Sequence, residues 1–221
     1  QGNNPLQINA QFVTENGSIG LAAEDPQDPP STLPYQRMSL LVATQADGIK
    51  LRFDAKTPNI GEGYIDAIID PKPAQKTING ALVLTDVQLK VFKPFFPGIR
   101  ELSGNASLAG GMSGPLTNPA FYGEFRLNNG KVVATRLPLN LQDINLSSSI
   151  RGTQATLTGQ FMSGAGKGTI TGLANWVDQP IINLKLDGTE LAVRQPPMLS
   201  ATISPNLDIQ ILPVKKQVTI N

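Results

Sequence analysis

The stretch DGIKLRFDAK, residues 47–56, alternates apolar and charged side chains with a period of two. Ile49, Leu51, Phe53 and Ala55 would therefore share one face of a strand, and the intervening charged side chains the other. The Asp-Gly pair that opens the stretch, placed between two alternating runs, is typical of a β-hairpin. The sequence around this stretch predicts antiparallel strands with one apolar face and one wet face.

The same alternation recurs along nearly the whole chain, and no stretch sustains a helical period. Asn129-Gly130 has the pattern of a type I′ turn, and residues 163–169 have that of a glycine-rich hairpin turn. Short strands at this spacing predict an all-β, antiparallel meander with almost no helix, arranged as a sandwich, a barrel or a long curled sheet. The other candidate strands lie at 6–12, 40–42, 65–69, 78–84, 87–91, 102–108, 121–127, 137–141, 144–150, 155–161, 168–174, 182–186, 191–193, 201–203, 207–211 and 218–220.

Two segments interrupt the alternation. Residues 24–34, EDPQDPPSTLP, predict a mobile loop, because prolines lack ladder donors and acidic side chains favour water. Residues 94–101 hold two prolines and a glycine and predict a corner followed by a short helical turn. Neither segment resembles a domain linker, so we expect residues 1–221 to form a single β-rich unit. The chain begins at Gln1 without Met and ends just after a strand, so we expect it to be a fragment of a larger protein.

Composition excludes several classes of function. The 221 residues are 40% hydrophobic and 16% charged, which is enough for a sizeable core. Lys and Arg number 18 against 17 Asp and Glu, so there is no basic footprint for nucleic acid. The chain has no Cys and no His, which excludes thiolate and imidazole metal sites, Cys nucleophiles and His-based triads. A Cys-free chain also suits an oxidising compartment such as the periplasm.

No segment approaches the roughly 18 apolar residues of a membrane-spanning helix, and the chain opens with no signal-like segment. We therefore expect any membrane anchor to lie outside this piece.

The motifs that could carry chemistry have simpler interpretations. Residues 163–169, SGAGKGT, resemble the end of a P-loop, but Phe161 stands where the first glycine is needed and a strand pattern follows. Glu24, Asp25 and Asp28 match no calcium loop. No acid, base and nucleophile stand together, so we expect no enzyme activity, no catalytic residue, no metal and no cofactor. A carboxylate pair brought together by the fold, as in a glycosidase, stays an alternative.

The inward positions are filled by Leu, Ile and Val with glycines between them, such as Gly80, Gly159 and Gly172, and aromatic residues make up only 5% of the chain. A closed sandwich fills its centre with bulky side chains, and aliphatic residues can serve. Small and aliphatic residues also suit a smooth open trough that holds an acyl chain. Composition alone leaves both alternatives open.

A series of motifs favours one of these two alternatives, the open trough over the closed sandwich. LSGNASLAG (102–110), GPLTNPAFYG (114–123), FRLNNGKV (125–132) and LPLNLQDI (137–144) are followed by the glycine-rich residues 166–172. Their order resembles the carboxy-terminal region of the TamB family, in the AsmA-like group of bridge-like lipid transport proteins. The resemblance extends over about residues 78–211.

The resemblance implies a fold and a function. Members of the family are anchored in the inner membrane of Gram-negative bacteria, extend through the periplasm as a long β-structure, and meet the TamA-type barrel protein of the outer membrane. Their sheet curls into an open apolar trough, the β-taco. The cargo implied is phospholipid acyl chains, or strands of outer-membrane proteins such as autotransporters under assembly. The family has no catalytic residue to carry over.

The apolar residues of the alternating runs are the expected lining of such a groove, and Lys50, Arg52, Asp54 and Lys56 are expected on the solvated face. The alternatives are pairing of an edge strand with a nascent barrel strand, and a structural or adhesive closed β-sandwich without cargo. The expected lining residues are Ile49, Leu51, Phe53, Leu82, Leu84, Leu108, Phe125, Leu127, Leu139, Leu141, Leu157, Phe161, Ile170, Leu184, Leu186, Ile203, Leu207 and Ile209.

Overall fold

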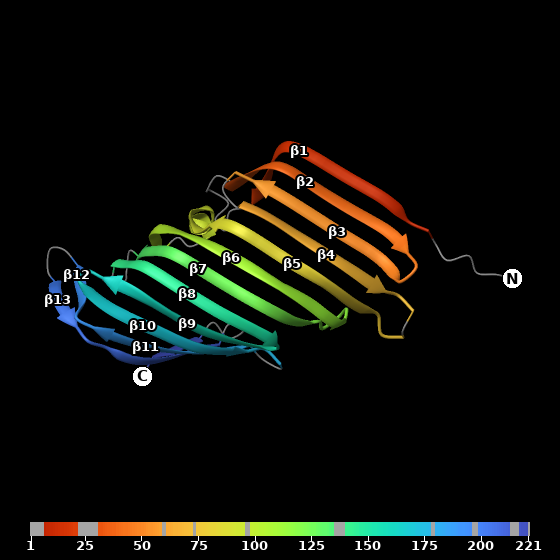
Figure 1. The fold of residues 1–221 in the computed structure, drawn as a ribbon. Coiled ribbons are helices and arrows are strands. Elements are labelled where there is room, and N and C mark those ends of the chain that lie inside the picture. Colours follow the sequence, from red (N-terminus) through yellow and green to blue (C-terminus); the bar gives the residue numbers. More distant parts are fainter. Residues whose placement is uncertain are drawn as a thin grey trace. The chain divides into compact units, whose positions relative to one another are not determined.

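A computed structural model of the chain consists almost wholly of β-strands (Figure 1). The prediction of an all-β antiparallel fold is confirmed. The described part of the chain contains no α-helix, and none of its helical segments has the length and apolarity needed to span a bilayer. The structure describes residues 7–21, 31–58, 61–72, 74–95, 98–134, 140–177, 180–195, 199–212 and 217–220.

Fifteen strands and one 3-10 helix, η1, follow one another in the described residues. The first part of the chain holds β1 (Asn9–Leu21), β2 (Ser31–Gln45), β3 (Gly48–Thr57), β4 (Gly61–Asp70), β5 (Thr77–Gln88), η1 (Leu89–Phe95), β6 (Ile99–Pro115) and β7 (Ala120–Ala134). The second part holds β8 (Asn140–Gly152), β9 (Gln154–Ser163), β10 (Gly166–Asn175), β11 (Ile181–Thr189), β12 (Leu191–Gln195), β13 (Leu199–Ile203), β14 (Asn206–Leu212) and β15 (Gln217–Ile220).

Thirteen of these strands are hydrogen-bonded in chain order, from β1 to β11 and then to β14 and β15. β12 and β13 pair only with each other and form a separate two-stranded sheet. In the described residues β1 and β15 end the order and do not pair with one another, so the sheet is open rather than a closed barrel. This topology agrees with the predicted meander.

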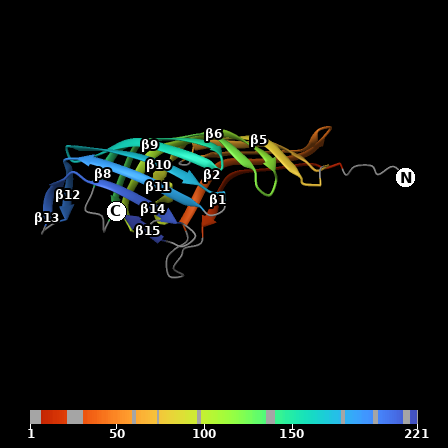
Figure 2. The same ribbon diagram turned by 90° about the horizontal axis from the view of Figure 1, so that it is seen from below.

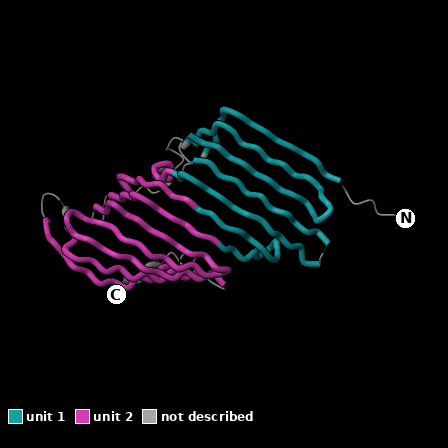
Figure 3. Tube along the Cα trace, viewed as in Figure 1, with its two compact units in different colours: residues 1–87, 108–122 teal, residues 88–107, 123–221 magenta. Residues whose placement is uncertain are grey.

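The chain divides into two compact units, coloured in Figure 3. Unit 1 comprises residues 1–87 and 108–122, and unit 2 comprises residues 88–107 and 123–221. The division cuts through β6 and β7, each of which contributes residues to both units. The expectation of a single β-rich body stays a prediction.

Two of the predicted turns have different outcomes. Asp47 lies in the turn between β2 and β3, and Gly48 opens β3 with φ of 150°, where a Cβ would run into the Ile69 carbonyl oxygen. Asn129-Gly130 is no turn, because β7 continues through it to Ala134. Asn129 instead adopts a left-handed φ of 52° within the strand, a backbone conformation typical of a β-bulge.

Asn145 on β8 joins this bulge to a second one. Its side-chain oxygen accepts a hydrogen bond from the Asn129 backbone N–H at 3.2 Å. Its side-chain nitrogen donates to the Asp143 carbonyl at 2.9 Å, and Asp143 has a positive φ of 51° at the point where the β8–β9 register shifts. Local side-chain bonding of this kind stabilises left-handed Asn and Asp residues, and sequence alternation alone does not reveal it.

The two predicted interruptions also need correction. Residues 24–30 of the expected loop lie outside the described residues, but residues 31–34 belong to β2, with Pro34 opposite Ser18 of β1. This end of β2 pairs with β1 alone, since its pairing with β3 begins at Arg37, and a proline is tolerated where one side of a strand needs no donor.

At the expected corner, the helical turn includes Pro94 and ends before Pro97 rather than following both prolines. η1 spans Leu89–Phe95, so the strand predicted at 87–91 ends at Gln88, and β6 begins at Ile99. Pro97 lies outside the described residues.

Candidate functional site: an apolar sheet face

In unit 1, the strand register places apolar residues of neighbouring strands opposite one another. Residues directly opposite in an antiparallel sheet point to the same face. The face formed in this way extends from β2 to β5 without a charged residue in its central rows. These rows are Val42–Leu51–Ala67–Gly80 and Leu40–Phe53–Ile65–Leu82.

Strands β8, β9, β10, β11 and β14 follow one another in unit 2 (Figure 2). Their register gives unit 2 an apolar face of the same kind. All fifteen residues of its three central rows are half-buried, so each keeps part of its surface open. The first row is Leu146–Gly159–Ile170–Leu186–Leu207, the second is Ser148–Leu157–Gly172–Leu184–Ile209, and the third is Ile150–Ala155–Ala174–Ile182–Ile211.

Large side chains on both faces lie over glycines of the neighbouring strand. Leu184 of β11 covers Gly172 of β10, where a Cβ would come within 2.6 Å of the leucine. A large side chain that lies across a glycine occupies the space that the glycine leaves empty. The apolar face is therefore more even in height than a row of alternating large and small residues would be. The other such pairs are Leu84 over Gly63, Leu146 over Gly159 and Phe161 over Gly168.

The opposite face of unit 1 carries a ladder of charges. Arg52 donates two hydrogen bonds to Asp54, at 2.8 and 3.0 Å, and one to Asp66 at 2.9 Å. The guanidinium also lies 5.2 Å from the ring centre of Tyr64, and Lys50 pairs with Asp66 at 3.5 Å. The hydrogen bonds to Asp54, and next those to Asp66, raise the pKa of Arg52 above its ordinary value, so this residue stays charged.

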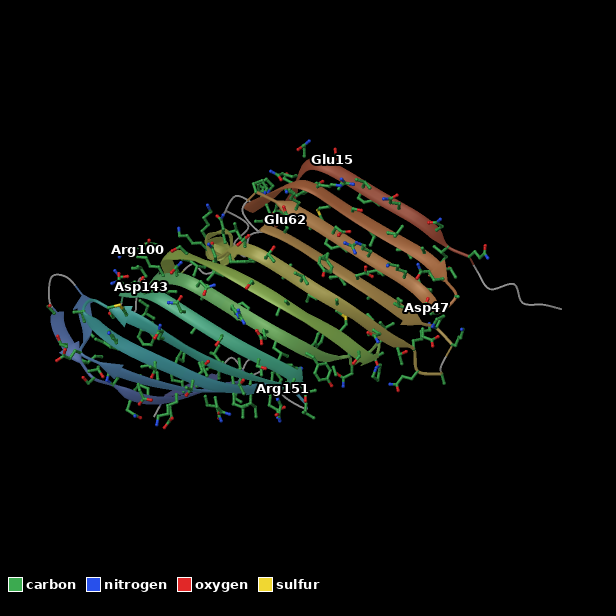
Figure 4. The ribbon with its side chains drawn as sticks, viewed as in Figure 1. Glu15, Asp47, Glu62, Arg100, Asp143 and Arg151 are labelled. Atoms are coloured by element: carbon green, nitrogen blue, oxygen red, sulfur yellow. The ribbon has the colours of Figure 1, made fainter. Side chains whose placement is uncertain are left out.

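The ladder lies on the face expected to be solvated, with Lys56 exposed and Lys50, Arg52 and Asp54 half-buried. Lys56 pairs with Glu62, which Figure 4 labels at the start of β4. The side chains of Lys56 and Glu62 are 57% and 61% exposed, and such exposed pairs contribute little to stability. The charges therefore fix which face meets water rather than form a reaction centre.

The opposite face of unit 2 is polar and mostly uncharged. Its central row is Ser147–Thr158–Thr171–Lys185–Asp208, and all five residues are exposed. A shallow hollow of about 490 Å³ lies along Thr171, Asn183, Lys185, Asp208 and Gln210, and its lining also includes Gly172, Leu184 and Ile209 of the apolar rows. Within the described residues, no group of three or more carboxylates is placed to hold a metal ion.

Most of the expected lining residues lie on one of the two apolar faces. Those in unit 1 are Ile49, Leu51, Phe53, Leu82 and Leu84. Those in unit 2 are Leu157, Phe161, Ile170, Leu184, Leu186, Leu207 and Ile209. Their contact with a cargo stays a prediction.

Four other residues of the expected lining lie on β6, β7 and β8 and differ in how far they are buried. Leu108, Phe125 and Leu141 are half-buried on β6, β7 and β8. Leu127 is only 7% exposed, because its side chain fills the space beside Gly104 and Gly130.

Two members of the expected lining are not assigned to either apolar face. Leu139 lies outside the described residues. Ile203 belongs to β13, which does not join the main sheet, and is 40% exposed opposite Leu191. Its contact with a cargo stays a prediction, because β12 and β13 form a hairpin of their own beside the main sheet.

Several residues of the two faces are absent from the expected lining. They include Leu40, Val42, Ile65, Leu146, Ile150, Ile182 and Ile211, all on the same faces by register. Each falls on the apolar side of its alternating run, so the pattern itself contains the signal. Leu191 and Val193 are 0% and 6% exposed, and no periodicity marks them as a covering segment.

Comparison with known proteins points to one family. Residues 1–127 match the family model described as TamB, N-terminal domain, which is more than half of the chain. The translocation and assembly module subunit TamB of Haemophilus influenzae is 21% identical over 179 residues. That alignment covers 80% of this chain and 14% of the relative, so the chain spans about a seventh of that protein. No solved structure matches the chain.

The match agrees with the family that the motifs indicated but not with the region. The motifs resembled the carboxy-terminal region from about residue 78 onward, whereas the matching model describes the N-terminal domain and includes the residues before 78. The expected carboxy-terminal position is therefore not supported. An open antiparallel sheet, an apolar face in each unit and the match over residues 1–127 lead to one conclusion: the chain belongs to the TamB family.

Proposed function

We propose that this chain is a periplasmic module whose apolar faces shield and conduct the acyl chains of phospholipids between the inner and outer membranes. The observation that carries the proposal is the apolar face of unit 2. Fifteen apolar or small residues in three rows are all half-buried, and they contribute no charged side chain. Continuous partly open apolar surface of this kind marks a site for an apolar partner.

The hydrogen bonding of the sheet favours an acyl chain over a polypeptide on this face. Strands β9, β10 and β11 each have a hydrogen-bonded neighbour on both sides, so their backbone groups are already paired. A peptide lying on the face would bury N–H and C=O groups without partners, which costs free energy. An acyl chain has no such groups and loses nothing on this account.

The size of the face fits the same cargo. A row from β8 to β14 crosses five strands, which is about 19 Å at the usual strand spacing. One acyl chain spans about half of the roughly 30 Å hydrocarbon core of a bilayer. Each methylene that leaves water contributes about 0.8 kcal/mol, and a shift by one methylene exchanges equivalent contacts, so the chain can slide.

A second cargo is favoured by the end of the sheet. β1 is 13 residues long and, among the described residues, pairs only with β2; Phe12 is 63% exposed and Ile19 is 43% exposed. An open edge with apolar side chains can add a strand by backbone hydrogen bonding. Assembly of outer-membrane proteins, including autotransporters, would use this edge rather than the apolar face.

The rest of the proposal concerns the whole protein. It places the chain in a protein anchored in the inner membrane, with a TamA-type barrel of the outer membrane as partner. No catalytic step is proposed, because transfer along an apolar surface needs no bond to form or break. A structural or adhesive sandwich without cargo is the alternative that the following experiment addresses.

The experiment is photo-crosslinking in cells from two neighbouring pairs of positions. Leu184 and Lys185 are adjacent on β11 and face opposite sides, as do Ile209 and Gln210 on β14. The proposal predicts phospholipid adducts at Leu184 and Ile209 and none at Lys185 and Gln210. Adducts to outer-membrane proteins at positions of β1 would support strand assembly. Equal labelling of both members of each pair, or none at Leu184 and Ile209 in folded protein, would refute the lipid role.

A further inference from the structure

The paired strands β12 (Leu191–Gln195) and β13 (Leu199–Ile203), called the hairpin below, pack over one end of the apolar face of unit 2. Figure 2 shows it beside the ends of β8, β9 and β10. Leu191 is fully buried and Val193 is 6% exposed, although the hairpin has no strand pairing with the main sheet. Their burial must therefore come from contact between the hairpin and the face beneath it.

Polar contacts fix the hairpin in place. Ser163, at the end of β9, is 0% exposed, and its hydroxyl donates to the Ala192 carbonyl at 2.8 Å. At the base, the Gly188 N–H donates to the Pro205 carbonyl at 2.8 Å, and the Glu190 N–H donates to the Ser204 hydroxyl at 3.1 Å. A buried hydroxyl with a partner this close would lose that partner if the hairpin moved.

Glycines in the main sheet leave room for the hairpin. A Cβ at Gly164 would meet Ala192, and one at Gly188 would meet Leu191. A Cβ at Gly166 would overlap the Glu190 carbonyl. Three close approaches between hairpin and sheet indicate a fitted contact rather than a loose one.

Burial along β9 and β10 changes where the hairpin lies. Phe161 is 5% exposed and Gly168, directly opposite it, is buried. Leu157, four residues earlier on the same strand and face, is half-buried, as is its partner Gly172. The covered end of the face therefore has little apolar surface left for a cargo, and the uncovered rows have more.

We infer that the β12–β13 hairpin is a fixed stop that closes this end of the apolar face and confines an acyl chain to the three uncovered rows. Along the strands these rows extend over about 14 Å, since the outer rows are four residues apart. Across the strands the same rows extend over about 19 Å, and within the part of the chain that the structure describes no second hairpin covers them from β8 to β14. A long acyl chain consequently lies across the strands, in the direction in which the sheet grows.

This inference rests on the proposed function, and matched probes on β9 separate the two. The 221-residue chain is prepared with a photo-reactive benzoylphenylalanine at Leu157 or at Phe161 and mixed with vesicles of palmitoyl-oleoyl phosphatidylethanolamine and phosphatidylglycerol. We expect at least tenfold more lipid adduct from position 157 than from position 161. Equal adducts at both positions would overturn the inference and leave the proposed function standing. No adduct at position 157 in folded protein would contradict the proposed function, and with it the inference.

Two further variants test the stop itself. The chain has no cysteine, so the double variant Gly164→Cys/Ala192→Cys can tie the hairpin to the β9–β10 turn. A local shift of about 1 Å is needed, because the two Cβ atoms would start 2.6 Å apart and a disulfide holds them about 3.5–4.5 Å apart. A fixed stop predicts the same adduct yield at position 157 with the disulfide closed or reduced. Loss of that yield on closing the disulfide would show a moving cover and overturn the inference.

In the second variant, residues 190–204 are replaced by a short Gly-Ser linker. The inference predicts that lipid adducts at position 161 rise to the level seen at position 157. If adducts at position 161 stay at their original level in folded protein, the hairpin is not what excludes the lipid, and the inference is wrong.

Discussion

The difference in burial between Phe161 and Leu184 leads to a quantitative prediction about the open face. Both residues lie on the apolar face of unit 2, on β9 and β11, but Phe161 is 5% exposed beneath the hairpin and Leu184 is half-buried. Truncating a buried Phe to Ala typically costs 3–5 kcal/mol, because a cavity remains. At Leu184 solvent reaches the side chain, so the cavity contribution falls away and roughly 1–2 kcal/mol of transfer energy is lost.

The assay is urea unfolding of Phe161→Ala and Leu184→Ala, each compared with the unchanged chain. We expect Phe161→Ala to lower the free energy of unfolding by about 2 kcal/mol more than Leu184→Ala. Leu184→Arg should also fold, since a long charged side chain can reach water from an open face. If Leu184→Ala costs as much as Phe161→Ala and Leu184→Arg unfolds, the face is the interior of a closed core and the reasoning is refuted.

Three other substitutions test individual contacts. Gly172→Val should lower the free energy of unfolding by about 1–3 kcal/mol in thermal or urea unfolding, because the added side chain runs into Leu184. Gly20→Ala should be close to neutral, because a Cβ at Gly20 would have nothing within 4 Å. Equal effects of the two substitutions would contradict the idea that Leu184 needs a glycine beneath it. Asn145→Ala should cost about 1 kcal/mol through the loss of its bonds to two bulges, with Asn145→Asp intermediate because it keeps only the acceptor. Arg52→Ala should lower the urea midpoint slightly, by an amount that shrinks as salt is added. Because the folded pKa of Arg52 is raised, its contribution is fully present below the unfolded pKa and is lost only as pH rises through the folded one; a change in the Arg52→Ala effect between mildly acid and mildly alkaline pH would contradict this.

The sequence predicts much of the fold because a period of two determines which residues share a face. The run from Ile49 to Ala55 forms β3 with its apolar residues opposite those of β2 and β4. A meander adds each strand beside the previous one, so alternation and turn spacing suffice for the topology. The glycine-rich residues 163–166 likewise form the predicted turn between β9 and β10.

Local exceptions to alternation could not be predicted in the same way. Asn129-Gly130 is a strong turn signal, yet Asn145 from the next strand holds Asn129 in a bulge and the strand continues. Leu89 and Val91 continue an alternating pattern, but they lie in η1. In each case a contact outside the segment, or a proline beyond it, decides the backbone, and a pattern within the segment cannot show that.

The sequence predicts which residue types form the apolar face, but it does not predict which part of that face the β12–β13 hairpin covers. Leu157 and Phe161 have the same position in the same alternating run, but only Phe161 lies at the covered end. The difference depends on β12 and β13 leaving the main sheet, which leaves β14 to pair with β11. Whether β11 pairs with β12 or with β14 depends on contacts between residues far apart in the chain, so a pattern within one strand cannot predict it.

The central claim is that the apolar face of unit 2 is open and takes up an acyl chain. The most direct measurement uses a fluorophore attached to Leu184→Cys, with Lys185→Cys as its control, in a chain that has no other cysteine. Phospholipids brominated along the acyl chain are added as quenchers. We predict strong quenching at position 184 and little at position 185. Equal quenching at the two positions, or none at position 184 in folded protein, would contradict the claim.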